Sequence, residues 1–206
     1  MAQLQRKNII LFSIVLVLML VFMSACALPM RKLTITHHPL DNVANKRPSK
    51  ILVMQFVDKR NKDNLDLIGK RVGLQEGARL EVVLTVFFAE ALSAAGYNAV
   101  MQDQQSPGVN PTNYDAVVTG EILEFWMDFN PGQVGHKVDI KIHAVSSANQ
   151  AVVWEKRIEA AQENVNWVGA RGEYSKVVDQ AVTKALNQAV HAFASDEFSM
   201  AIRNKE

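Results

Sequence analysis

The stretch "YDAVVTGEILEFWMDF", residues 114–129, decides the fold, because it has the pattern of one long strand whose two faces exchange roles part-way along. Val118, Gly120 and Ile122 share one face, since alternate side chains of a strand point to opposite sides. From Leu123 onwards the apolar residues fall on the other face. A β-bulge explains such a change of phase, and so does a strand that extends beyond its sheet.

The change of phase sets the directions of two neighbouring aromatic residues, Phe125 and Trp126, which must point to opposite sides of the strand. If a bulge resets the phase, Phe125 lies in the core and Trp126 is exposed. We favour this alternative because Glu124 then lies outside as well. If the first phase persists, Trp126 packs inward and Phe125 is exposed.

Phe125, Trp126 and Phe129 are also the best candidates for a binding surface in this sequence. An exposed cluster of aromatic side chains holds a partner protein or stacks on a sugar ring. The alternative is that these side chains pack under the ends of helices and belong to the core. We name Phe125, Trp126 and Phe129 as candidate partner-binding residues on the first of these two interpretations.

Around this strand the sequence predicts further strands and two helices. Apolar or alternating residues predict strands at 51–57, 98–102, 136–145 and 151–160. Apolar residues at helical spacing predict helices within 78–97 and 173–194, and a short extra helix can start at Ser195.

The order β-α-β-β-β-β-α predicts a single small α+β domain, 51–206, with a mixed, mostly antiparallel sheet and two helices packed on one face. The loop between the first strand and the first helix, from Asp58 to Gly73, is charged and contains two glycines. Residues 26–50 contain three prolines and little apolar periodicity, so we expect an extended tether, within which 32–36 can add an edge strand. The domain is expected to fold without this tether.

The amino terminus has the organisation of a secretion signal. Arg6 and Lys7 supply positive charge, and the apolar run at 9–23 is interrupted only by Ser13. This run is shorter than the roughly 20 residues that a spanning helix needs. Small residues follow, and then Cys26, the single cysteine of the chain.

The segment "VFMSAC", residues 21–26, resembles the bacterial lipoprotein signal, although Met23 stands where that family usually has leucine. The resemblance implies removal of residues 1–25 and attachment of acyl chains such as palmitate to Cys26, which would anchor the protein stably. Ala27 follows in place of the aspartate that retains such proteins in the inner membrane, so the resemblance implies the outer membrane, with the domain facing the periplasm. The alternative is an uncleaved membrane anchor with an incidental cysteine.

Several short motifs further along the chain resemble the YajG-like family of small bacterial lipoproteins. They are "FVDKR" at 56–60, "LIG" at 67–69, "ALSAAGY" at 91–97 and "YDAVVTGEI" at 114–122. The resemblance implies an outer-membrane lipoprotein with a small α+β domain and no established catalytic residues.

The sequence contains no motif for nucleophilic, metal or phosphate chemistry. His136, His143 and His191 have no ligand spacing, so we expect them at solvated or helix-face positions and predict no metal or other cofactor. The net charge is +1, and removal of residues 1–25 takes away two basic and no acidic residues, which leaves −1. A chain so close to neutral has no concentrated basic face for nucleic acid.

Asp58 and Arg60 lie in the charged loop after the first predicted strand and are further candidate partner-binding residues. They can instead form a local ion pair that orders the loop, or belong to a solvated connection, which is the interpretation we favour.

The sequence therefore predicts a non-catalytic, lipid-anchored envelope protein that binds an unknown protein partner or supports outer-membrane organisation. The alternative is an accessory subunit of an envelope system that transports or assembles lipid, polysaccharide or protein. A flat polar surface with one aromatic patch would favour the first function. An apolar groove between sheet and helices would favour the second.

Overall fold

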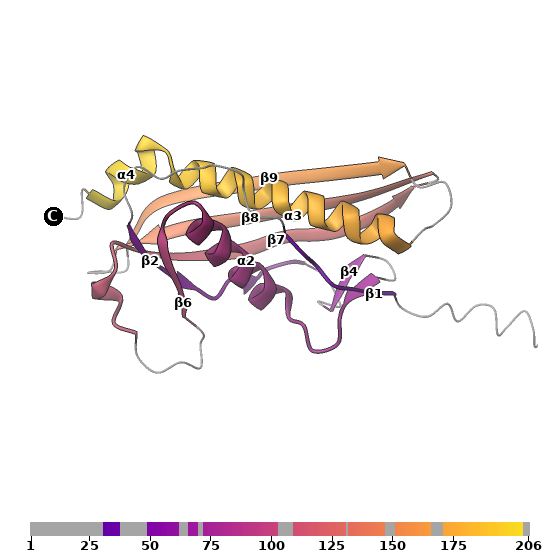
Figure 1. Cartoon of the computed structure of the whole chain (residues 1–206), viewed down its shortest axis with the longest axis horizontal. Helices are drawn as coiled ribbons and strands as arrows, with labels where there is room; N and C mark the ends of the chain where they lie inside the picture. The colour runs from indigo at the N-terminus through magenta and orange to yellow at the C-terminus, as the bar shows by residue number, and fades with distance from the viewer. Residues whose placement is uncertain are drawn as a thin grey trace, which may run out of the picture. The chain divides into compact units, whose positions relative to one another are not determined.

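The structure is a computed structural model that describes residues 31–37, 49–61, 66–69, 72–102, 109–130, 132–146, 151–165 and 171–203 (Figure 1). The chain divides into two units, Met1–Arg31 and Lys32–Glu206, and the second contains nearly all of the described residues. Cys26 and the predicted signal segment lie outside the described residues.

Three long antiparallel strands form the larger part of the sheet (Figure 1). They are β7 (Ala116–Asn130), β8 (Gln133–Val145) and β9 (Val152–Val165). Along β8 one face is buried and the other is largely polar, which is the pattern of an antiparallel sheet with a single face on the core. The sequence alternation therefore predicted this half of the sheet correctly.

The second edge of β7 is paired, one after another, by three short parallel strands: β2 (Lys50–Met54), β3 (Val57–Asp58) and β4 (Leu67–Gly69). Beyond β2 lies β6 (Asn98–Gln102), also parallel. Beyond β4 lie the antiparallel β5 (Val72–Leu74) and then β1 (Arg31–Leu33). The described residues thus form one mixed sheet of nine strands. The strand β4 and most of β5 occupy the segment that the sequence predicted as a loop, and β3 lies at the boundary between that loop and the predicted first strand.

The helices α2 (Leu80–Ala94) and α3 (Arg171–Phe193) pack against the sheet, and α4 (Asp196–Arg203) follows α3 (Figure 1). A short 3-10 helix, η1 (Pro111–Asn113), precedes β7. Aromatic rings join the layers: Phe88 of α2 and Trp154 of β9 both contact the ring of Phe193, with centroids 5.6 and 5.0 Å apart. The predicted single α+β domain with helices on the sheet is confirmed.

The phase change in β7 is a β-bulge at Leu123. Ile122 pairs with Ile140 and Glu124 pairs with Asp139, so Leu123 is an extra residue without a cross-strand partner. After the bulge Phe125 is fully buried, and Trp126 lies on the opposite side of the strand, half-buried. The favoured alternative is confirmed for Phe125, whereas Trp126 is less exposed than we expected.

Before the bulge, Gly120 makes room for Phe56. A Cβ atom at residue 120 would lie 2.7 Å from the Phe56 ring, closer than any real contact, so only glycine fits while that ring stays in place. Phe56 in turn packs on Phe88, with ring centroids 5.3 Å apart. The missing side chain in β7 therefore lets the segment after β2 reach helix α2.

Residues 32–37 belong to the domain, although the sequence assigned them to the tether. Leu33 and Ile35 are buried in the core. The backbone N–H and the hydroxyl of Thr36 donate to the carboxylate of Asp179 on α3, at 2.8 and 2.7 Å. The expected edge strand is present as β1, and the core begins well before residue 51.

We expect a chain that starts at Ser49 to be less stable than one that starts at Lys32. It lacks Leu33 and Ile35, and burial of an aliphatic side chain contributes about 1.5–3 kcal/mol. The free energy of unfolding, measured with urea and circular dichroism, should fall by about 3 kcal/mol. The double variant Leu33→Ala, Ile35→Ala in the longer chain should reproduce most of this loss; equal stability of the two chains would contradict the assignment.

Candidate functional site

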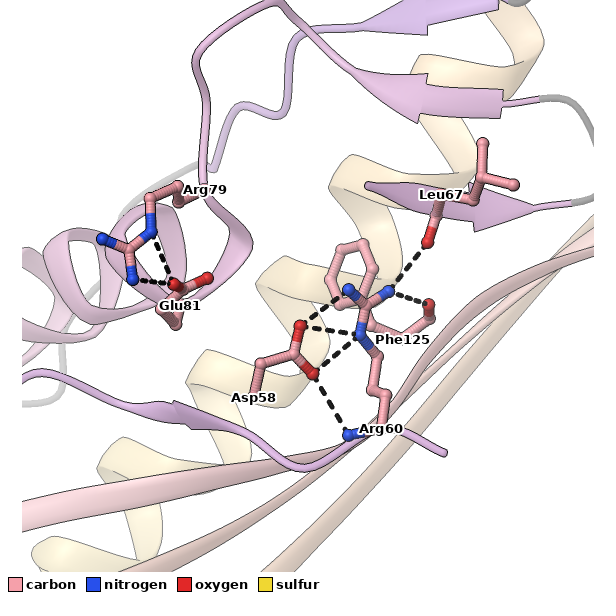
Figure 2. A network of polar contacts seen from close by, with 6 residues as sticks. All are labelled: Asp58, Arg60, Leu67, Arg79, Glu81 and Phe125. Carbon is pink, nitrogen blue, oxygen red and sulfur yellow. Dashed lines mark hydrogen bonds and ion pairs between the residues drawn. The ribbon is translucent and has the colours of Figure 1, made fainter. Parts of the chain in front are cut away.

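Asp58 and Arg60 form a buried ion pair beside the middle of β7 (Figure 2). The Arg60 side chain is fully buried, and its Nε and Nη2 atoms donate to the two carboxylate oxygens of Asp58 at 2.9 and 2.7 Å. The backbone N–H of Arg60 also donates to Asp58, at 3.1 Å. Pairing of β3 with Ile122 holds Asp58 in position for these contacts.

The same guanidinium group holds two other strands. Nη1 of Arg60 donates to the carbonyl oxygen of Leu67 at 2.9 Å and to that of Phe125 at 3.4 Å (Figure 2). Leu67 starts β4, and Phe125 follows the bulge in β7. The local ion pair among our alternatives is therefore present, and it fastens β3 and β4 to β7. Arg60 does not lie at the surface, so it is not available to a partner protein.

His136 on β8 is a buried residue that the sequence analysis placed wrongly in solvent. It is 2% exposed, and its ring meets the Phe125 ring edge-on with centroids 4.4 Å apart. Neither ring nitrogen has a hydrogen-bond partner among the described residues. Burial, together with the positive charge of Arg60, lowers the pKa of His136 from 6.5 to about 3, so the ring is neutral. His136 lies two residues before Val138, which was expected to point inward, and alternate residues of a strand share a face. This spacing was the signal in the sequence that could have revealed the buried position of His136.

The aromatic candidates do not form one cluster. Phe125 is buried on the core side, so it is not part of a surface, which corrects its assignment as a partner-binding residue. Phe129 is 41% exposed at the end of β7 and meets the ring of Tyr174 on α3 edge-on, at 5.3 Å. Trp126 is half-buried on the outer face. The bulge thus separates side chains that are neighbours in sequence.

The outer face of β7–β9 bears a ladder of charges that neutralise one another. Lys137 contacts Glu124 at 2.8 Å, Arg157 contacts Asp139 at 2.6 Å, and Lys141 contacts Glu155 at 2.8 Å. The hydrogen bond that Lys137 donates to Glu124 raises the pKa of Lys137, and the hydrogen bond that Lys141 donates to Glu155 lowers the pKa of Glu155. This face is polar, and Lys137, Lys141 and Arg157 each contact a carboxylate of the same face.

The space between sheet and helices is filled. The cavity there measures about 10 Å³ and is lined by apolar residues, among them Phe56, Leu84 and Val182. A larger hollow of about 670 Å³ lies along α3, where its described lining consists of residues of that helix alone. A cavity of about 10 Å³ has room for about one water molecule, not for a lipid chain.

No group of three or more histidine, cysteine, aspartate or glutamate side chains in the described ranges is arranged to hold a metal ion. No described helix is both long enough and apolar enough to cross a membrane. Asp58, Arg60, Phe125 and His136 are thus brought together as a buried structural cluster, while Trp126 and Phe129 remain the surface candidates.

Comparison with known proteins shows similarity of fold. No family model matches the sequence, and no curated protein matches it. Protein XCC0632 from Xanthomonas campestris, of family DUF330, is 12% identical with a TM-score of 0.60, over 82% of this chain and 96% of that one. A neuraminyllactose-binding hemagglutinin homolog from Helicobacter pylori is 12% identical with a TM-score of 0.50, over 82% and 98%. Lipoprotein GNA1162 from Neisseria meningitidis is a more distant match, 17% identical over 70% and 99%, with a TM-score of 0.39.

Replacing Asp58 by alanine should destabilise the domain by about 3–5 kcal/mol, because the buried Arg60 charge loses its counter-ion. The matched control is Arg79→Ala, which breaks the exposed pair with Glu81 shown in the same figure (Figure 2). An exposed pair contributes at most about 1 kcal/mol. Equal, small losses in the two variants, measured by urea unfolding, would show that the Asp58–Arg60 pair does not hold the strands.

The stability of the domain should fall as the pH decreases below about 6.5, because the unfolded chain then protonates His136 and the folded chain does not. Between pH 7 and pH 5 the contribution of His136 is a loss of about 2 kcal/mol. His136→Leu should remove this part of the pH dependence, and the exposed His191→Leu should retain it. Parallel pH profiles for all three proteins would overturn the assignment of His136 as a buried neutral ring.

Proposed function

We propose that this chain is a non-catalytic lipoprotein of the bacterial envelope, anchored through acyl chains on Cys26 and related to the YajG-like family. Its domain binds a protein partner or supports outer-membrane organisation from the periplasmic side. The observation that carries the proposal is the position of the single cysteine. Cys26 lies directly after the apolar run at 9–23 and six residues before Lys32, where the compact unit begins.

The geometry of the described residues favours binding over transport. The cavity between sheet and helices that is lined by Phe56, Leu84 and Val182 is too small for a lipid chain or a polysaccharide, which the alternative accessory function would have to bind. The outer face of β7–β9 is polar and charge-neutralised, with Trp126 half-buried among the charged side chains. Such a polar face with one partly exposed aromatic residue suits a partner protein. A single aromatic side chain can supply much of the binding energy of a protein interface.

Cys26→Ser should abolish lipid attachment, because the thioether requires the thiol, and should leave the longer precursor uncleaved. Cells that express the full chain are labelled with a clickable fatty acid, and the membranes are separated by density. The matched control is Ser24→Ala, which changes the signal segment but keeps the cysteine. The native chain and Ser24→Ala should be labelled and found in the outer-membrane fraction. Equal labelling of Cys26→Ser would refute the proposal.

A further inference from the structure

We propose that the end of the sheet formed by Phe129 of β7 and Val165 of β9 rests against the lipid surface that holds Cys26. We call these two residues the apolar tip. The inference rests on the proposed function and specifies how the anchored domain is oriented. It assigns the tip to a membrane surface, whereas the outer face of β7–β9 stays open to a protein partner.

The length of chain between the anchor and the fold limits how far the domain can lie from the bilayer. Only residues 27–31 separate Cys26 from Lys32. Even fully extended, this segment spans at most about 20 Å, since each residue adds roughly 3.3–3.6 Å. Leu33 is already buried in the core. A domain with so short a connection stays close to the bilayer and turns toward it the end from which β1 starts.

Phe129 lies at the end of the sheet from which β1 starts. β1 lies beside β5, β5 beside β4, and Gly69 of β4 pairs with Met127 of β7, two residues before Phe129. Three strand spacings amount to about 14 Å. Within the second unit, β1 starts at the same end as the arrowheads of β7 and β9 and the first turn of α3 (Figure 1).

The apolar tip has the chemistry of a weak contact with lipid. The register Asn130↔Gln133↔Val165 brings the ends of β7, β8 and β9 level with one another. Phe129 is 41% and Val165 is 56% exposed, so both present apolar surface to the solvent. Exposed apolar side chains such as phenylalanine are buried at the boundary between lipid headgroups and acyl chains.

The nearby exposed charges include the acidic Asp128 and Glu163, so attraction to anionic lipid is not what draws this end to the surface. Two partly exposed apolar side chains bind a bilayer weakly by themselves. They become effective when the anchor keeps them at a high local concentration beside the bilayer. The contact should therefore form on neutral phosphatidylcholine and should require the anchor.

The test uses the single thiol of the chain. Protein that starts at Cys26 keeps the whole compact unit, and its thiol is coupled to a maleimide lipid in phosphatidylcholine vesicles. Tryptophan is introduced in separate variants, Phe129→Trp and Val165→Trp, and quenching by brominated acyl chains is measured relative to the parent protein. The matched control is Val152→Trp, because Val152 is 57% exposed and pairs with Val145 at the opposite end of β9.

We expect at least about a twofold greater quenching of the added tryptophan at 129 and 165 than at 152, and no such difference for uncoupled protein. Insertion of 20 glycine and serine residues after Leu28, which adds about 25 Å of flexible chain, should reduce the difference. Equal quenching at the two ends, or none above the parent protein at 129 and 165, would overturn the inference. Because the lipid is attached chemically, such a failure would leave the fatty-acid labelling of Cys26 as a separate test of the proposed function.

Discussion

The whole domain depends on hydrogen bonding along both edges of β7. One edge pairs with β8 for nearly its full length, and the other pairs in turn with β2, β3 and β4. A buried strand cannot leave its backbone groups unpaired without a large loss of stability. The three short strands meet this requirement in succession, and the buried Arg60 adds donors to the carbonyls of Leu67 and Phe125 where pairing is interrupted.

The bulge at Leu123 decides which side chains the domain offers to its surroundings. It moves Phe125 into the core against His136 and leaves Trp126 on the outer face. The buried charge of Arg60 is balanced by Asp58, and His136 is kept neutral beside it. These polar groups within the core are structural, because each is withdrawn from solvent and from any ligand outside.

Much of the fold could be predicted from sequence because its long elements have clear periods. The strands of the β7–β9 meander and the helices α2 and α3 extend over at least 13 residues, enough for alternation or helical spacing to be recognised. Even the bulge was visible as a change of phase. The strands β4 and β5 were missed, and β3 was not separated from the predicted first strand, because two or three residues define no period.

The candidate site was harder to predict, because the burial of its side chains depends on packing between segments that are distant in sequence. Nothing local in "DKR" at 58–60 distinguishes a solvated charge from one that reaches the backbone of Leu67 and Phe125. His136 was misplaced because histidine was weighed as a polar residue, although its position in the alternation of β8 pointed inward. The tether was overestimated because the apolar residues Leu33 and Ile35 are too few to stand out among prolines and charges.

The proposed anchor at Cys26 requires that this cysteine be the first residue of the mature protein, a few residues before the compact unit begins at Lys32. The most direct measurement is the mass of the amino-terminal peptide of the protein extracted from its own membranes. We predict a peptide that begins at Cys26 and carries a diacylglycerol thioether and an acylated amine. An unmodified cysteine within a peptide that continues into residues 20–25, or a mature terminus at any other residue, would contradict it.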